Sequence, residues 1–136
     1  TSPATAEGLE LVIGGIHPET GDLGSYGPPM NRADGLAVDT INEMVANVSG
    51  AVTAKFVSAD TASTAENAVS AARKVVGEGA SCLIGPVTTP EAIAVLNGVT
   101  KARKIAMIPE ASAVKLRETD DAGTIFRINS SRRPPG

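Results

Sequence analysis

The sequence is poor in aromatic and sulfur-containing residues. Of its 136 residues, two are phenylalanine, one is tyrosine and none is tryptophan, and Cys82 is the only cysteine. A single cysteine excludes an internal disulfide and a cysteine zinc cluster. Without large aromatic rings, a core has to be built from Ala, Val, Ile and Leu, which suits helices that lie closely on a sheet.

A strong excess of one charge and a long apolar run are also absent. Twelve basic residues against fifteen acidic ones give a net charge of −3, which is no electrostatic footprint for nucleic acid. No apolar run approaches the roughly 18–20 residues that a membrane span requires. With 42% hydrophobic residues, the chain is expected to fold as one domain rather than to be disordered.

Motifs for catalysis, cofactors and metals are missing as well. The sequence has no Gly-X-Ser-X-Gly elbow, no dinucleotide-binding glycine turn and no Walker lysine loop. His17, the only histidine, has no Cys or acidic residue at metal-ligand spacing, which favours packing in a loop over a metal site. The sequence therefore predicts no cofactor and no metal, and it gives little support for catalysis.

Short apolar runs alternate with amphipathic segments along the chain. Strands are predicted over residues 10–16, 51–59, 81–84, 104–108 and 124–128. Helices are predicted over residues 30–48, 65–76 and 89–99. The apolar positions expected to bury one face of the first helix are Ala33, Leu36, Ala37, Ile41, Met44 and Val48.

Several residues are predicted to begin or end these helices. Gly50 would end the first helix, a capping box from Ser63 to Glu66 would begin the second, and Thr89 would cap the third. Strands separated by helices predict right-handed crossovers, and therefore an α/β fold with a three-layer, doubly wound parallel sheet.

In such sheets, ligands bind beyond the carboxyl ends of the strands, where the strand order reverses. Three loops leave those ends, at residues 17–29, 85–89 and 109–112. The second loop carries Thr88 and Thr89 with free backbone N–H groups at a helix start, an arrangement that accepts a carboxylate. The alternative for this loop is that Thr89 only caps its helix.

The other two loops also have two interpretations each. Pro109-Glu-Ala-Ser112 offers a carboxylate, backbone carbonyls and a hydroxyl that could receive an ammonium group; alternatively, Glu110 is solvated and Ser112 only forms the turn. Tyr26 lies in a glycine-rich segment of the first loop and is a candidate lid or stacking surface, with ordinary loop packing as the alternative.

Together, these segments resemble the solute-binding proteins of branched-chain amino-acid ABC transporters, which have the type I periplasmic binding fold. The resemblance runs from Leu9 to about Ser130. The matching stretches are Val12-Ile-Gly-Gly-Ile16, Thr20-Gly21, Ser25-Tyr26-Gly27, Gly35-Leu-Ala-Val-Asp-Thr-Ile-Asn42, Ala68-Val-Ser-Ala-Ala-Arg-Lys74, Leu83-Ile-Gly-Pro86 with Thr88-Thr89, Ile108-Pro109 with Ala111-Ser112, and Phe126-Arg127.

The resemblance implies two α/β lobes that close on a ligand, of which this chain would form one partial lobe. Residues 1–8 would then be a lead-in that follows a removed signal peptide, and residues 130–136 a tail toward the second lobe. The implied function is a periplasmic, non-enzymatic ABC importer component that binds a small amino-acid-like solute and works with permease subunits. The alternatives are the extracellular ligand-sensing domain of a receptor and, less favoured, a doubly wound enzyme.

The resemblance also implies where a ligand would bind. Thr88 and Thr89 fall on the turn that holds the α-carboxylate of the amino acid. The turn that holds its α-ammonium corresponds to Glu110, Ala111 and Ser112.

Tyr26 falls on the aromatic residue that lines the side-chain pocket in this family. Two residues depart from the family pattern, because Glu110 stands where relatives usually carry a small residue and His17 stands near a frequent glycine. A carboxylate at Glu110 could complement an amine or repel an acid, so the ligand stays open among amino acids, aromatic acids, amides and other small molecules.

Overall fold

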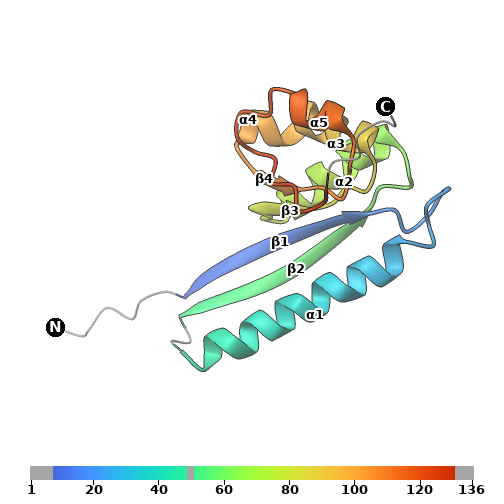
Figure 1. Ribbon diagram of the computed structural model, residues 1–136. Helices are drawn as coiled ribbons and strands as arrows, with labels where there is room; N and C mark the ends of the chain where they lie inside the picture. The colour runs from blue at the N-terminus through green and yellow to red at the C-terminus, as the bar shows by residue number, and fades with distance from the viewer. Residues whose placement is uncertain (1–7, 49–50, 131–136) are drawn as a thin grey trace.

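The computed structural model describes residues 8–48 and 51–130, and no helix within them is long and apolar enough to cross a membrane. Strands and helices alternate along the chain (Figure 1). In order, they are β1 (Leu9–His17), α1 (Gly27–Ala46), β2 (Val52–Asp60), α2 (Ala65–Gly77), β3 (Cys82–Ile84), α3 (Thr89–Val95), the π-helical turn η1 (Leu96–Thr100), α4 (Lys101–Arg103), β4 (Ala106–Ile108) and α5 (Val114–Glu118).

The four strands form a parallel sheet in the order β2-β1-β3-β4. The strand order reverses at β1, because α1 leads to one side of this strand and α2 leads to the other. Figure 1 shows α1 alone on one face of the sheet and α2 to α5 on the opposite face. The predicted three-layer, doubly wound α/β fold is confirmed.

The predicted fifth strand at residues 124–128 is wrong. This segment makes only one isolated bridge, between Ile125 and Met107. The bridge consists of two backbone hydrogen bonds, from Met107 N to Thr124 O at 2.8 Å and from Phe126 N to Met107 O at 2.9 Å. Its neighbour β4 has only three residues, so no longer ladder can form there. The short helix α5 was not predicted at all.

The core lies between the sheet and the helices α2 and α3. Ile16, Leu83 and Met107 reach it from three different strands, and each is fully buried. Gly14 faces the same side, and a Cβ built on it would lie 2.8 Å from a Val75 methyl group. The absence of a side chain at residue 14 therefore lets α2 approach the central strand closely.

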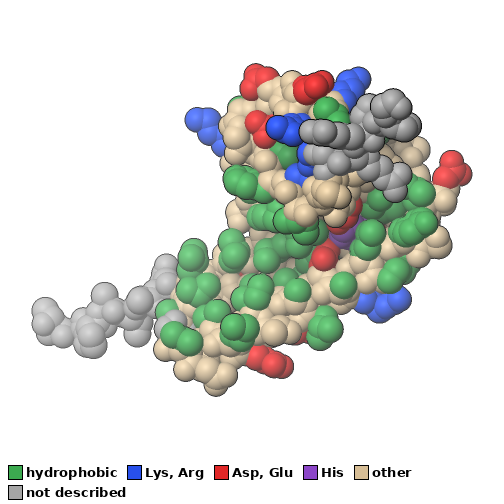
Figure 2. All heavy atoms as spheres, viewed as in Figure 1, with side chains coloured by type: hydrophobic (Ala, Val, Ile, Leu, Met, Phe, Trp, Pro, Cys, Tyr) green, Lys and Arg blue, Asp and Glu red, His purple; other side chains and the backbone are tan. Residues whose placement is uncertain are grey.

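The predicted buried face of the first helix is wrong. Ala33, Leu36, Ala37, Ile41, Met44 and Val48 are all exposed. The sheet is instead contacted by the helix face that contains Val38, which is only 4% exposed. Apolar side chains of α1 next to the Val38 face, such as Ile41 and Met44, therefore remain exposed among the described residues. Figure 2 shows hydrophobic side chains gathered along the hollow between α1 and the helices of the other face.

Two of the predicted helix starts are displaced by one residue. Thr64, rather than Ser63, caps α2, and its hydroxyl accepts from Asn67 N at 3.2 Å. Thr88, rather than Thr89, caps α3. The predicted stop of the first helix at Gly50 lies outside the described residues, and α1 ends at Ala46.

Asn42 attaches α1 to the edge strand β2. Its Oδ1 accepts from the Ala54 backbone N–H at 2.7 Å, and its Nδ2 donates to the Ala54 carbonyl at 2.8 Å. Both backbone groups belong to a buried residue of a strand that, within the described part of the chain, has no strand neighbour on that side. The asparagine side chain thus takes the place of a further strand.

We expect Asn42→Ala to lower the free energy of unfolding by about 2–3 kcal/mol, because two buried backbone groups lose their partners. Asn47→Ala is the matched control, since Asn47 is exposed and bonds only the Glu43 carbonyl near the end of α1. Its cost should stay below about 0.5 kcal/mol. Urea unfolding measures both, and equal losses would contradict the role given to Asn42.

Candidate functional site

The turns that follow β1, β3 and β4 meet at one end of the sheet. Gly85 has φ of +99°, and a side chain there would overlap the carbonyl of Ile16 at the end of β1. Gly85 N donates to Ile108 O at 2.9 Å, and Glu110 N donates to Pro86 O at 3.1 Å. These contacts place the predicted second and third loops side by side, next to the end of the central strand.

In the turn before α3, the two neighbouring threonines have different roles. The Thr88 hydroxyl donates to Glu91 Oε2 at 2.5 Å and accepts from Glu91 N at 3.4 Å, while Thr88 N donates to the same carboxylate at 3.1 Å. This is a complete capping box. Thr89 is half-buried, and its hydroxyl makes no hydrogen bond within residues 8–48 and 51–130. Thr89 is therefore the threonine whose side chain is available to a ligand.

The turn after β4 presents its three predicted residues differently. Ala111 is 2% exposed and belongs to the core, so it offers only its backbone. The carbonyl of Glu110 already accepts from Asn129 Nδ2 at 2.5 Å. Ser112 is half-buried, and no described residue bonds its hydroxyl. Ser112, like Thr89, is therefore a half-buried residue whose hydroxyl is not bonded to any described residue.

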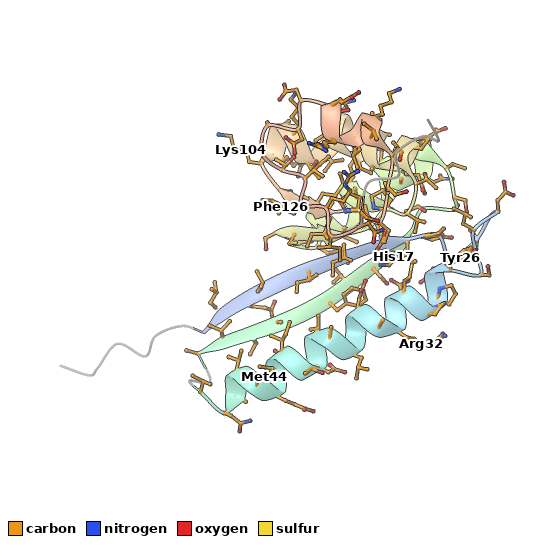
Figure 3. All side chains as sticks on the ribbon, viewed as in Figure 1. His17, Tyr26, Arg32, Met44, Lys104 and Phe126 are labelled. Carbon is orange, nitrogen blue, oxygen red and sulfur yellow. The ribbon has the colours of Figure 1, made fainter. Side chains whose placement is uncertain are left out.

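Tyr26 lies where the first loop joins α1, at the same end of the sheet as His17 (Figure 3). Its ring is 55% exposed, and among the described residues its hydroxyl has no hydrogen-bond partner. The ring is thus accessible to solvent at this end of the sheet.

Asp60 holds the first loop, although the sequence analysis missed it. Its Oδ1 accepts from the backbone N–H groups of Glu19 at 2.8 Å, Thr20 at 3.2 Å and Ala62 at 2.7 Å. Its Oδ2 accepts from the Thr20 hydroxyl at 2.6 Å. Burial alone would raise the pKa of Asp60, but these hydrogen bonds together hold the pKa below its usual value. The available signal was a carboxylate directly at the end of a predicted strand.

The prediction that His17 lies in a loop is wrong. His17 is the last residue of β1, and it is fully buried. Its Nε2 lies 2.7 Å from Asp34 Oδ2, and its Nδ1 lies 3.9 Å from Glu110 Oε1. Burial raises the pKa of the Glu110 carboxyl, and the facing imidazole opposes that change. In residues 8–48 and 51–130, no group of His, Cys, Asp or Glu side chains is arranged to hold a metal ion.

A separate pocket of about 280 Å³ lies beside α5. It is lined by Leu116, Arg117, Thr119, Asp121, Ile125 and Arg127. None of the predicted site residues borders it, and it does not lie at the turns where the strand order reverses. We therefore assign the candidate site to the strand ends, on the ground of topology.

Comparisons with known proteins agree with this fold. A family model described as "Periplasmic binding protein" matches residues 10–133. The Leu/Ile/Val-binding protein BraC3 of Rhizobium johnstonii is 35% identical over 107 residues, which are 79% of this chain and 29% of that protein. The Leu/Ile/Val-binding protein homolog 3 of Brucella melitensis is 31% identical over 113 residues, or 83% of this chain and 30% of that protein.

A solved structure gives the same result. The substrate-binding protein LivJ of Streptococcus pneumoniae, in complex with isoleucine, superposes with a TM-score of 0.76 at 26% identity. The match covers 90% of this chain and 34% of that one. The chain thus spans about a third of the length of these relatives.

The Asp60 contacts predict a specific dependence of stability on pH. Because the pKa of Asp60 is lowered in the folded state, its stabilisation is complete above the unfolded value near 4 and is lost as the pH falls through the folded value. We expect Asp60→Asn to cost about 1 kcal/mol at pH 7 after allowance for solvent screening. The variant should also lose less stability than the wild type between about pH 5 and pH 3.

Asp39→Asn is the matched control, since Asp39 lies exposed on α1 and makes no hydrogen bond with the described residues. Urea unfolding at a series of pH values measures all three proteins. Parallel stability curves for the wild type and Asp60→Asn would show that Asp60 does not anchor the loop.

Proposed function

Because the chain belongs to the periplasmic binding protein family, we propose that it forms part of one lobe of a solute-binding protein for an ABC importer. In this proposal the protein holds a small amino-acid-like solute without changing it chemically, and it delivers the solute to permease subunits from a periplasmic location. The names of its relatives, which refer to leucine, isoleucine and valine, support the ligand class.

The observation that carries the proposal is the pair of unused hydroxyls at the strand ends. Thr89 and Ser112 lie on turns joined by the hydrogen bond between Glu110 N and Pro86 O. Both are half-buried, and neither hydroxyl is bonded to a described residue. Such hydroxyls can donate to a carboxylate and accept from an ammonium group. Tyr26, at the outer end of the first loop, would border the side chain of the solute.

The exposed apolar stripe on α1 supports the proposal that this is only part of a lobe. Parallel sheets are almost always covered on both faces. Here α1 packs on β1 and β2. Two apolar residues of α1 itself, Ile41 and Met44, are nevertheless 41% and 64% exposed. The relatives are about three times as long as the matched region. We propose that such additional chain covers this face and supplies a second lobe.

The first test is calorimetric titration with a panel of amino acids. We expect a longer protein that contains this lobe to bind at least one solute with micromolar or better affinity. This chain alone should bind it at least 100-fold more weakly, because it lacks the contacts of the second lobe and cannot close to exclude water. Equal affinity of this chain alone would contradict the two-lobe proposal.

Within the longer protein, Thr89→Ala and Ser112→Ala should each weaken binding by about tenfold or more, because each removes a hydrogen bond to a charged group. Neither substitution should change the melting temperature. Thr40→Ala is the matched control, since that hydroxyl bonds only the Leu36 carbonyl on α1. Unchanged affinity in both site variants would show that the solute binds elsewhere.

A second experiment tests the cover over α1. In this chain alone, we expect Ile41→Lys to reduce self-association without lowering the free energy of unfolding by more than about 0.5 kcal/mol. In the longer protein the same substitution should cost about 2 kcal/mol or more, because it would bury a charge.

Leu36→Lys is the control, because Leu36 is also apolar and exposed but lies on another side of the helix. It should cost little in both proteins. Light scattering and urea unfolding provide the two measurements. An equally small cost of Ile41→Lys in both proteins would show that the face stays uncovered.

A further inference from the structure

One imidazole and three carboxylates converge where β1 and β4 end. His17 pairs with Asp34 at 2.7 Å and faces Glu110 at 3.9 Å. Asp34 and Glu91 both lie close enough to Glu110 to raise its pKa. His17 and Glu91 are 0% and 1% exposed, whereas the Glu110 side chain keeps 27% of its surface exposed. Figure 2 shows the histidine next to acidic side chains in the hollow.

The charges of this cluster are not balanced by the described residues. Its ion pairs involve His17 only, and no lysine or arginine among residues 8–48 and 51–130 pairs with the three carboxylates. Even a protonated imidazole would neutralise only one of the three negative charges.

Three polar atoms of the cluster are buried without a hydrogen-bond partner. They are His17 Nδ1, Glu91 Oε1 and Glu110 Oε2. Glu91 Oε1 and Glu110 Oε2 are acceptors without a donor, and His17 Nδ1 is a third acceptor where the imidazole donates from Nε2 to Asp34 and carries no second proton. Leaving a buried polar atom unpaired destabilises the folded protein, and more so where the atom is charged. In the capping box, Glu91 Oε2 accepts hydrogen bonds from Thr88, but Glu91 Oε1 accepts none.

We infer that Glu110, with His17 behind it, is a specificity-determining residue that selects solutes with a positively charged nitrogen group in addition to the α-ammonium. The inference rests on the proposed function. An ammonium or guanidinium group has several N–H donors and no acceptor, which is the complement of this cluster. The Glu110 side chain is 27% exposed, so a solute can contact it, whereas His17 and Glu91 are buried behind it.

Other occupants fit the cluster less well. A metal ion is not favoured, because the described side chains form no group arranged to ligate one. An aliphatic side chain would offer the Glu110 carboxylate no donor, and an acidic side chain would add a further negative charge. The preference should therefore differ from that of relatives named for leucine, isoleucine and valine.

The test is calorimetry on the longer protein that contains this lobe, with arginine, lysine, leucine and glutamate as solutes. We expect arginine or lysine to bind at least tenfold more tightly than leucine, and glutamate to bind least. Glu110→Gln should weaken binding of the basic solute at least tenfold and leave leucine unchanged. Glu110→Asp, which keeps the charge but withdraws it by one methylene, should have a smaller effect in the same direction.

Glu118→Gln is the matched control, because Glu118 is exposed on α5 and should change no affinity. If leucine binds as tightly as the basic solutes and no Glu110 variant changes their ratio, this inference is overturned while the proposed function stands. If neither basic solute binds the wild-type protein, this inference is overturned, and the proposed function is overturned as well only if no amino acid of the full panel binds. Should Glu110→Gln fail to fold, an unchanged ratio in Glu110→Asp overturns the inference by itself.

Discussion

The approach of Gly85 to the end of β1 is the contact on which the arrangement of the site depends. The left-handed φ of Gly85 and the proximity of the Ile16 carbonyl leave no room for a side chain there. The turn after β3 can therefore lie directly against the central strand. Hydrogen bonds then fix the turn after β4 to it, through Ile108 and Glu110. A single glycine thus brings loops from distant parts of the sequence to one edge.

At that edge, similar side chains divide into structural and available groups. The hydroxyl of Thr88 and one oxygen of Glu91 are occupied by helix capping, and Asp60 is occupied by the backbone of the first loop. Thr89 and Ser112 make no comparable bonds among the described residues. Residue type alone does not separate these two groups, because the difference lies in the hydrogen bonds that each side chain makes. A one-residue shift of the helix start exchanges the roles of the two threonines.

The sequence predicted the four strands of the sheet, the main helices and the convergence of the loops, because these follow from hydrophobic period and from parallel strand direction. It also predicted a fifth strand that the structure does not have over residues 124–128. It could not predict which side of α1 would be covered, because a pattern shows that Ile41 and Met44 are apolar but not what packs on them. The pair of His17 and Asp34 also escaped prediction. These residues are 17 positions apart, and only the packing of α1 against β1 brings them together.

The uncovered face and the acidic cluster are physically connected. The histidine lies among the apolar side chains that line the hollow (Figure 2), and Glu110 faces it at 3.9 Å, so we expect chain that covers this face to remove water near Glu110 as well. Burial already raises the pKa of that carboxyl. Further exclusion of water strengthens its attraction to a cation and increases the cost of leaving it unpaired. Discrimination between charged and neutral solutes should therefore be sharper in a protein whose α1 face is covered than in this chain alone.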